Sequence, residues 1–147
     1  MDAPNLRLLW TLGLAGLLPF AAAALAVLLA PDYWGGFARG ALIAYGAVIL
    51  SFLGAVHWGF ALRAPPEEAW ATPARLVLGV VPSLVAWVAM LTAHEAPSLI
   101  VLAAGILGTA AMEQWAVGRG LVPGFYMRLR WVLSLGAALC LVVPFLM

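Results

Sequence analysis

Five apolar segments, each long enough to cross a lipid bilayer, constrain this chain more than any other feature. They lie near residues 6–30, 37–62, 73–93, 97–117 and 125–145. A membrane-spanning helix needs about 20 mostly apolar residues, and each segment meets that length. The breaks between them, "APDYWGG", "RAPPEEAWAT", "HEAP" and "GRGLVPG", are short and carry proline or glycine with charge. The pattern predicts an all-α integral membrane bundle of five transmembrane helices, built as a single domain over residues 1–147.

The composition supports a membrane location and excludes several soluble classes. Hydrophobic residues make up 66% of the chain, charged residues make up 9%, and the mean hydropathy is +1.09. These values lie far outside the range of soluble globular domains. All seven basic residues are arginines and the net charge is +1, so no lysine-rich surface for nucleic acid is expected. The single cysteine, Cys140, can form no disulfide within the chain.

The arginines predict an orientation in the membrane. Basic residues beside short loops are retained on the cytoplasmic side. With five spans, the N-terminus and the second and fourth connections share one face, and Arg39 alone marks the opposite face. The arginines of the first face are Arg7, Arg63, Arg75, Arg119, Arg128 and Arg130. This asymmetry predicts an N-in/C-out arrangement.

Two prolines lie inside predicted spans. Pro19 falls within the first segment and Pro82 within the third. A proline inside a helix cannot donate a backbone hydrogen bond, and the resulting distortion leaves carbonyl groups that neighbouring helices must satisfy. We therefore expect helix kinks at Pro19 and Pro82.

Two ionisable residues, His57 and Glu113, lie within predicted spans. His57 precedes Arg63 by six residues and Glu113 precedes Arg119 by six, which is about 9 Å along a helix. Both helices run toward the predicted cytoplasmic face, so the two groups share one depth. Ionisable groups inside a span are costly, face other helices and often mark function. We expect the two side chains to meet if the second and fourth helices are neighbours.

Three interpretations of this pair remain open. The two groups form a structural hydrogen bond between helices, reach toward lipid headgroups, or serve as a proton relay or ligand anchor. Arg128 and Arg130 lie about 200° apart around the last helix, so one can reach lipid phosphate while the other faces the bundle. The candidate ligand or proton-relay residues are His57, Glu113, Trp58, Gln114, Arg128 and Arg130.

The sequence predicts no catalytic or metal-binding residues. His94 and Glu95 fall in a loop at the membrane face opposite His57, so the two histidines cannot share a metal ion or a haem. There is no nucleophile triad and no phosphate-binding glycine loop. Whether the chain is an enzyme stays open, and the balance favours a protein that is not. No cofactor is predicted, although a quinone or lipid would suit a polar anchor inside the membrane.

Three motifs resemble signature blocks of a five-helix bacterial membrane family. They are "GLAGLLPF" from Gly13, "YGAVILSFLGAVHWG" from Tyr45 and "VPGFYMRLRWVLS" from Val122. The family includes the mitochondrial transmembrane protein 69, and the resemblance covers nearly the whole chain. It implies a five-span bundle in a bacterial or mitochondrial inner membrane. It implies no activity, because a fold alone transfers no mechanism.

The sequence therefore favours a non-enzymatic, multi-pass protein of the bacterial inner (plasma) membrane with an accessory or binding role. A lipid, quinone or partner helix is expected to bind on the cytoplasmic side, near His57, Trp58, Glu113 and Arg128 or Arg130. The alternative is a small proton-coupled transporter or channel that uses the His57 and Glu113 pair. The expected partners are the lipid bilayer and a membrane-protein partner or second copy of the chain, and not nucleic acid.

Overall fold

The chain folds into a bundle of long helices. The computed structural model describes residues 3–30, 32–91 and 95–145. Its elements are α1 (Ala3–Ala15), α2 (Leu18–Leu29), α3 (Asp32–Leu62), η1 (Pro66–Ala71), α4 (Thr72–Leu91), α5 (Glu95–Val117), α6 (Gly124–Val142) and η2 (Val143–Phe145). No β-strand occurs among these described residues.

Five segments of the described chain are long and apolar enough to cross a membrane. They are Asn5–Leu29, Trp34–Leu62, Pro66–Leu91, Ala96–Val117 and Gly124–Val142. A helix satisfies all its backbone hydrogen bonds within itself, which is why such segments are helical in lipid. The expected all-α bundle of five membrane helices is confirmed.

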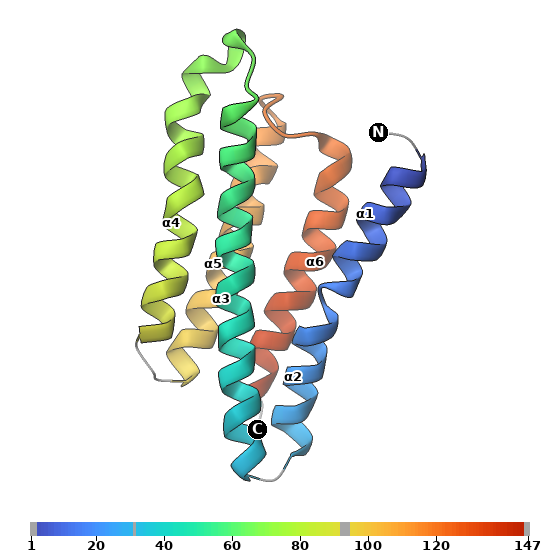
Figure 1. Cartoon of the computed structure of the whole chain (residues 1–147), viewed down its shortest axis with the longest axis vertical. Helices are drawn as coiled ribbons and strands as arrows, with labels where there is room; N and C mark the ends of the chain where they lie inside the picture. The colour runs from blue at the N-terminus through green and yellow to red at the C-terminus, as the bar shows by residue number, and fades with distance from the viewer. Residues whose placement is uncertain (1–2, 31, 92–94, 146–147) are drawn as a thin grey trace.

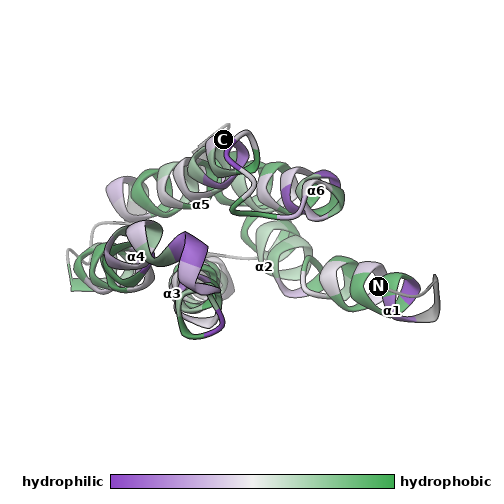
Figure 2. Cartoon of the chain, turned by 90° about the horizontal axis from the view of Figure 1, so that it is seen from above, coloured by the Kyte–Doolittle hydropathy of each residue, from purple (hydrophilic) through white to green (hydrophobic). Residues whose placement is uncertain are grey.

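The spans run alternately in opposite directions. In Figure 1 the start of α1, the η1 segment and the α5–α6 loop lie at the upper end. Seen from above, α3 and α4 lie side by side, α5 and α6 form an adjoining row, and α2 packs against α3 (Figure 2). α1 leans away from this group and contacts α6. The bundle is therefore compact on the α4 side and open on the α1 side.

The first span, predicted over residues 6–30 with a kink at Pro19, is divided into two helices. A turn at Gly16 and Leu17 separates α1 from α2, and Pro19 lies in the first turn of α2. In a continuous helix the ring of Pro19 would collide with the carbonyl four residues earlier, whereas the first turn of a new helix tolerates proline. The Tyr45 hydroxyl on α3 donates a hydrogen bond to the Gly16 carbonyl at 3.0 Å. A neighbouring helix thus satisfies a backbone group at the break.

The third span passes through its proline without interruption. α4 is helical on both sides of Pro82, beside the close approach of α3 and α4. A Cβ atom added at Gly54 of α3 would lie 2.8 Å from the Gly79 carbonyl oxygen and 3.4 Å from Pro82 Cβ. Trp58 covers Gly79, and its indole N–H donates to the Leu76 carbonyl at 3.1 Å. Small residues permit this contact between the two backbones.

The other helix ends differ modestly from the sequence expectation. α3 begins at Asp32 rather than near residue 37, and its first glycines, Gly35 and Gly36, have no neighbouring atoms that restrict them. The α5–α6 loop turns at Gly120, whose φ of 72° is one that L side chains rarely adopt. Such local differences do not alter which helices face one another.

Candidate functional site

A charged pair lies inside the bundle, within two membrane-spanning segments. Glu113 of α5 is completely buried and Arg130 of α6 is 2% exposed. The Arg130 Nε donates a hydrogen bond to Glu113 Oε2 at 2.6 Å. The short distance and the burial make this an ion pair in which each charge compensates the other.

Two hydroxyl groups bind the remaining nitrogens of the Arg130 guanidinium. Nη1 donates to Ser134 Oγ at 2.5 Å, and Nη2 donates to Thr109 Oγ1 at 2.7 Å. Ser134 lies one helical turn after Arg130, and Thr109 lies one turn before Glu113, so helix geometry brings both hydroxyls to the pair. Every guanidinium nitrogen therefore has a partner, as burial of a charge requires.

His57 of α3 lies on the other side of Glu113. The histidine is 5% exposed, and its Nε2 lies 3.4 Å from Glu113 Oε1. Within the described part of the chain, Oε1 accepts no hydrogen bond. α3, α5 and α6 thus each contribute one ionisable side chain to a single buried group. We call His57, Thr109, Glu113, Arg130 and Ser134 the polar cluster.

Three of the residues predicted as candidates lie outside the polar cluster. Trp58 packs on α4, as described above. Gln114 accepts a hydrogen bond from the Trp131 indole at 3.0 Å, and Arg128 is exposed. Successive helical residues point in directions about 100° apart, so proximity in sequence does not place them in one site. The rotation of α6 directs Arg130, and not Arg128, into the bundle.

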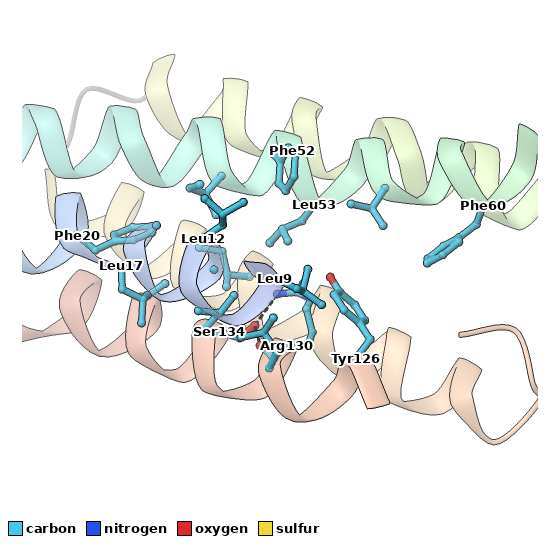
Figure 3. Close-up of a pocket in the computed structure, with 18 residues that line it drawn as sticks. Leu9, Leu12, Leu17, Phe20, Phe52, Leu53, Phe60, Tyr126, Arg130 and Ser134 are labelled. Carbon is cyan, nitrogen blue, oxygen red and sulfur yellow. Dashed lines mark hydrogen bonds between the residues drawn. The ribbon is translucent and has the colours of Figure 1, made fainter. Parts of the chain in front are cut away.

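An elongated apolar cavity lies beside the polar cluster, among α1, α2, α3 and α6. Its volume is about 440 Å³. Along α3 the lining extends from Ile49 to Phe60, about 17 Å at 1.5 Å per residue. Figure 3 shows leucine and phenylalanine side chains around it, with Tyr126, Arg130 and Ser134 as its polar lining. We call this space the α1 cavity.

A smaller cavity lies on the opposite side of the polar cluster, among α3, α4 and α5. Its volume is about 220 Å³, and His57 and Thr109 contribute to its lining together with apolar side chains. Arg130 and Ser134 line the α1 cavity instead. The polar cluster therefore forms a partition between the two cavities.

A second arginine–glutamate pair lies at the end of the bundle where α1 begins. Arg75 of α4 binds Glu68 of η1, with 2.6 Å between Nη2 and Oε2. The same Nη2 donates to the Leu121 carbonyl in the α5–α6 loop at 3.2 Å. This pair ties two neighbouring connections together at the rim of the bundle.

The sequence interpretation assigned no binding role to several residues of this region. Thr109 and Ser134 could have been found from their spacing of four residues from Glu113 and Arg130. The α1 cavity gave no sequence signal, since its walls are ordinary apolar side chains. Among the described residues, no group of three or more His, Cys, Asp or Glu side chains gathers. His94 lies outside the described residues.

Taken together, these features define a class: multi-pass membrane proteins with a charged network buried between helices. The chain belongs to the family described as "Protein of unknown function (DUF3429)", which matches residues 6–146. The family resemblance inferred from the three sequence motifs is thus confirmed.

Two relatives extend this comparison to animals. The chain is 40% identical to "Transmembrane protein 69" of Xenopus tropicalis over 143 residues, 96% of this chain and 54% of the relative. It is 33% identical to the protein of the same name from Mus musculus over 149 residues, 100% of this chain and 58% of the relative. The chain therefore spans just over half the length of these relatives. No solved structure matches the chain.

Proposed function

We propose that this protein is a non-enzymatic binding protein that holds a lipid-like molecule, a lipid or a quinone, in the α1 cavity. The observation that carries the proposal is an apolar cavity of about 440 Å³ with a buried polar cluster at its wall. Ligand sites typically occupy about 300–1,000 Å³ and combine apolar walls with a few polar groups that orient the ligand. The α1 cavity has this size and this character.

The position of α1 supports access from the bilayer. α1 leans away from α3 over the upper half of the bundle (Figure 1). Leu9 and Leu12 of α1 line one part of the cavity, and Phe52 and Phe60 of α3 line another (Figure 3). A chain-like apolar molecule would pack against side chains of this kind without losing hydrogen bonds.

The test is isolation of the protein in native nanodiscs, followed by mass spectrometry of the lipids and quinones that accompany it. We expect one lipid-like species to be enriched over its share of the membrane. Val56→Trp adds bulk to a residue of the cavity lining, and we expect this variant to lose the enriched species. Val48→Trp on the lipid-facing side of the same helix is the matched control, because Val48 is 61% exposed. Equal lipid content in the parent, the variant and empty nanodiscs would contradict the proposal.

The same proposal includes a place and partners for the protein. We propose the bacterial inner membrane with the N-in/C-out arrangement, because the arginine asymmetry favours it. The bilayer and a membrane-protein partner or second copy of the chain remain the proposed contacts. Reporter fusions to the C-terminus, active only outside the cytoplasm, would test the orientation, and a cytoplasmic signal would overturn it.

A second candidate function is proton-coupled transport. It is favoured by the contact of His57 with Glu113 in a partition between two cavities, since intramembrane proton relays use such residues. The test uses liposomes loaded with a pH-sensitive dye and compares the parent with His57→Ala and Glu113→Gln. Proton flux that equals that of empty liposomes would contradict this candidate.

A further inference from the structure

The hydrogen-bonding groups around the α1 cavity are mainly donors. A guanidinium carries five N–H groups, and Arg130 makes three hydrogen bonds, one from each nitrogen. Two of its N–H groups therefore have no acceptor within the described part of the chain. Arg130 contributes to the cavity lining, so a ligand in the cavity would contact this side chain.

Tyr126 adds a second kind of donor to the same cavity. Figure 3 shows its ring rising from α6 with the hydroxyl directed toward the α3 side of the cavity. The Tyr126 hydroxyl makes no hydrogen bond to any other described residue, whereas the Tyr45 hydroxyl is bound to the Gly16 carbonyl. A phenol on an apolar wall is stabilised when a ligand supplies an acceptor.

Acceptors are scarce on this wall. Ser134 Oγ already accepts from Arg130 Nη1 and donates its proton to the Arg130 carbonyl at 2.7 Å. Glu113 is not part of the lining, and its Oε2 is bound to Arg130. The cavity is thus suited to a ligand that accepts hydrogen bonds.

The charge balance of the wall disfavours an anionic ligand. Arg130 is the only charged residue of the lining, within the residues that the structure describes, and Glu113 already compensates it at 2.6 Å. A phosphate entering the cavity would bring a second negative charge close to Glu113 in an apolar environment, where uncompensated charge is expensive. An uncharged acceptor meets no such penalty.

From these contacts we infer that the α1 cavity binds an uncharged carbonyl group on a hydrocarbon tail, the chemistry of a quinone or a glyceride ester. The carbonyl oxygen accepts hydrogen bonds from Tyr126 and Arg130, and the tail lies along the α3 wall. This inference rests on the proposed binding function and adds the chemical class of the ligand's polar end.

The test uses the purified protein in alkyl-maltoside micelles, which contain no carbonyl group, with native mass spectrometry as the readout. Three probes are titrated: a decyl-substituted benzoquinone, dioctanoylglycerol and dioctanoyl phosphatidic acid. The last two differ only by a phosphate group. We expect the quinone, the glyceride or both to bind at least about tenfold more tightly than the phosphatidic acid. The preferred carbonyl probe then identifies the source of the ligand.

Two variants test the Tyr126 hydroxyl and the Glu113 charge separately. Tyr126→Phe removes one hydrogen-bond donor. We expect it to lower the affinity for the carbonyl probe about fivefold, the ratio that corresponds to one hydrogen bond. Ser83→Ala is the control and should leave the affinity unchanged, because that hydroxyl donates to the Val80 carbonyl of its own helix and does not line the cavity. Glu113→Gln leaves the guanidinium uncompensated and should shift the preference toward phosphatidic acid.

The outcomes distinguish this inference from the proposed function. Phosphatidic acid binding as tightly as the glyceride, or a Tyr126→Phe variant with unchanged affinity for the carbonyl probe, overturns the inference and leaves a lipid-binding protein. If none of the three probes binds and Val56→Trp changes no lipid content in nanodiscs, the proposed function itself fails.

Discussion

Arg130 and Arg75 each meet a glutamate at 2.6 Å, but the two contacts lie in different surroundings. The Arg130 and Glu113 side chains are 2% and 0% exposed, whereas the Arg75 and Glu68 side chains are 8% and 30% exposed. Glu68 is partly exposed, so solvent screens its charge, whereas a charge that is completely buried needs a full set of partners. Only the Arg130–Glu113 pair, called the deep pair below, has a hydroxyl bound to each remaining guanidinium nitrogen. Equal distances therefore do not imply equal energetic roles.

The largest expected effect comes from breaking the deep pair. Arg130→Met leaves Glu113 buried without its counter-charge, and we expect a loss of about 3 to 5 kcal/mol in the free energy of unfolding. Equilibrium unfolding in mixed detergent micelles measures it. A loss below about 1 kcal/mol would contradict the assignment of a buried, mutually dependent pair.

Removing both charges together tests whether Arg130 and Glu113 depend on each other. Arg130→Met combined with Glu113→Leu replaces the ion pair with apolar groups of similar length, which is often neutral in a buried setting. We expect the double variant to recover most of the stability that Arg130→Met loses, in the same unfolding measurement. Additive losses from the two substitutions would mean that the residues act independently.

The hydroxyl partners should have an intermediate effect. Thr109→Val removes the acceptor for Arg130 Nη2 with little change in shape, and we expect a loss of about 1 to 3 kcal/mol, since a buried donor is left unbound. Thr11→Val is the matched control, because Thr11 is exposed and bonds only its own helix at the Arg7 carbonyl. Similar losses in both variants would argue against a special role for Thr109.

The Arg75–Glu68 pair, called the rim pair, should have the smallest effect on stability. Glu68→Gln removes its charge, and we expect a loss of about 1 kcal/mol that diminishes at high salt, because Arg75 is buried but solvent reaches Glu68. The unfolding measurement is made at low and at high ionic strength. The Arg130 variant should respond to salt far less, because its pair is buried. A salt-independent loss above about 2 kcal/mol at Glu68 would remove the contrast between the two pairs.

The helices could be predicted well, because each membrane span must satisfy its backbone within itself. The exact position of the break in the first span could not be predicted. Pro19 indicates a distortion, but the position of the turn at Gly16 and Leu17 also involves the Tyr45 hydroxyl from another helix. That contact could not be predicted from local sequence, because Tyr45 lies 29 positions from Gly16. Pro82 illustrates the converse, because α4 accommodates it without a break.

The candidate site could be predicted only in part. Counting back from Arg63 and Arg119 indicates that His57 and Glu113 share a depth, since the rise per residue of a helix is constant. The counting cannot say how far α6 is rotated, and that rotation distinguishes Arg130 from the exposed Arg128. The spacing of residues along one helix also does not reveal how that helix is tilted, so the α1 cavity could not be predicted from the sequence.

The sequence alone is enough to predict that this protein crosses a membrane as five helices, and that His57 and Glu113 lie at the same level along their helices. Both follow from local physics: the transfer of apolar side chains into lipid and the regular rise of a helix. The packing of the helices sets which helix faces meet, and so places Arg130 beside Glu113 and His57 at the edge of the α1 cavity. These features depend on side-chain packing between helices, where shape and hydrogen bonding rather than hydropathy select the arrangement.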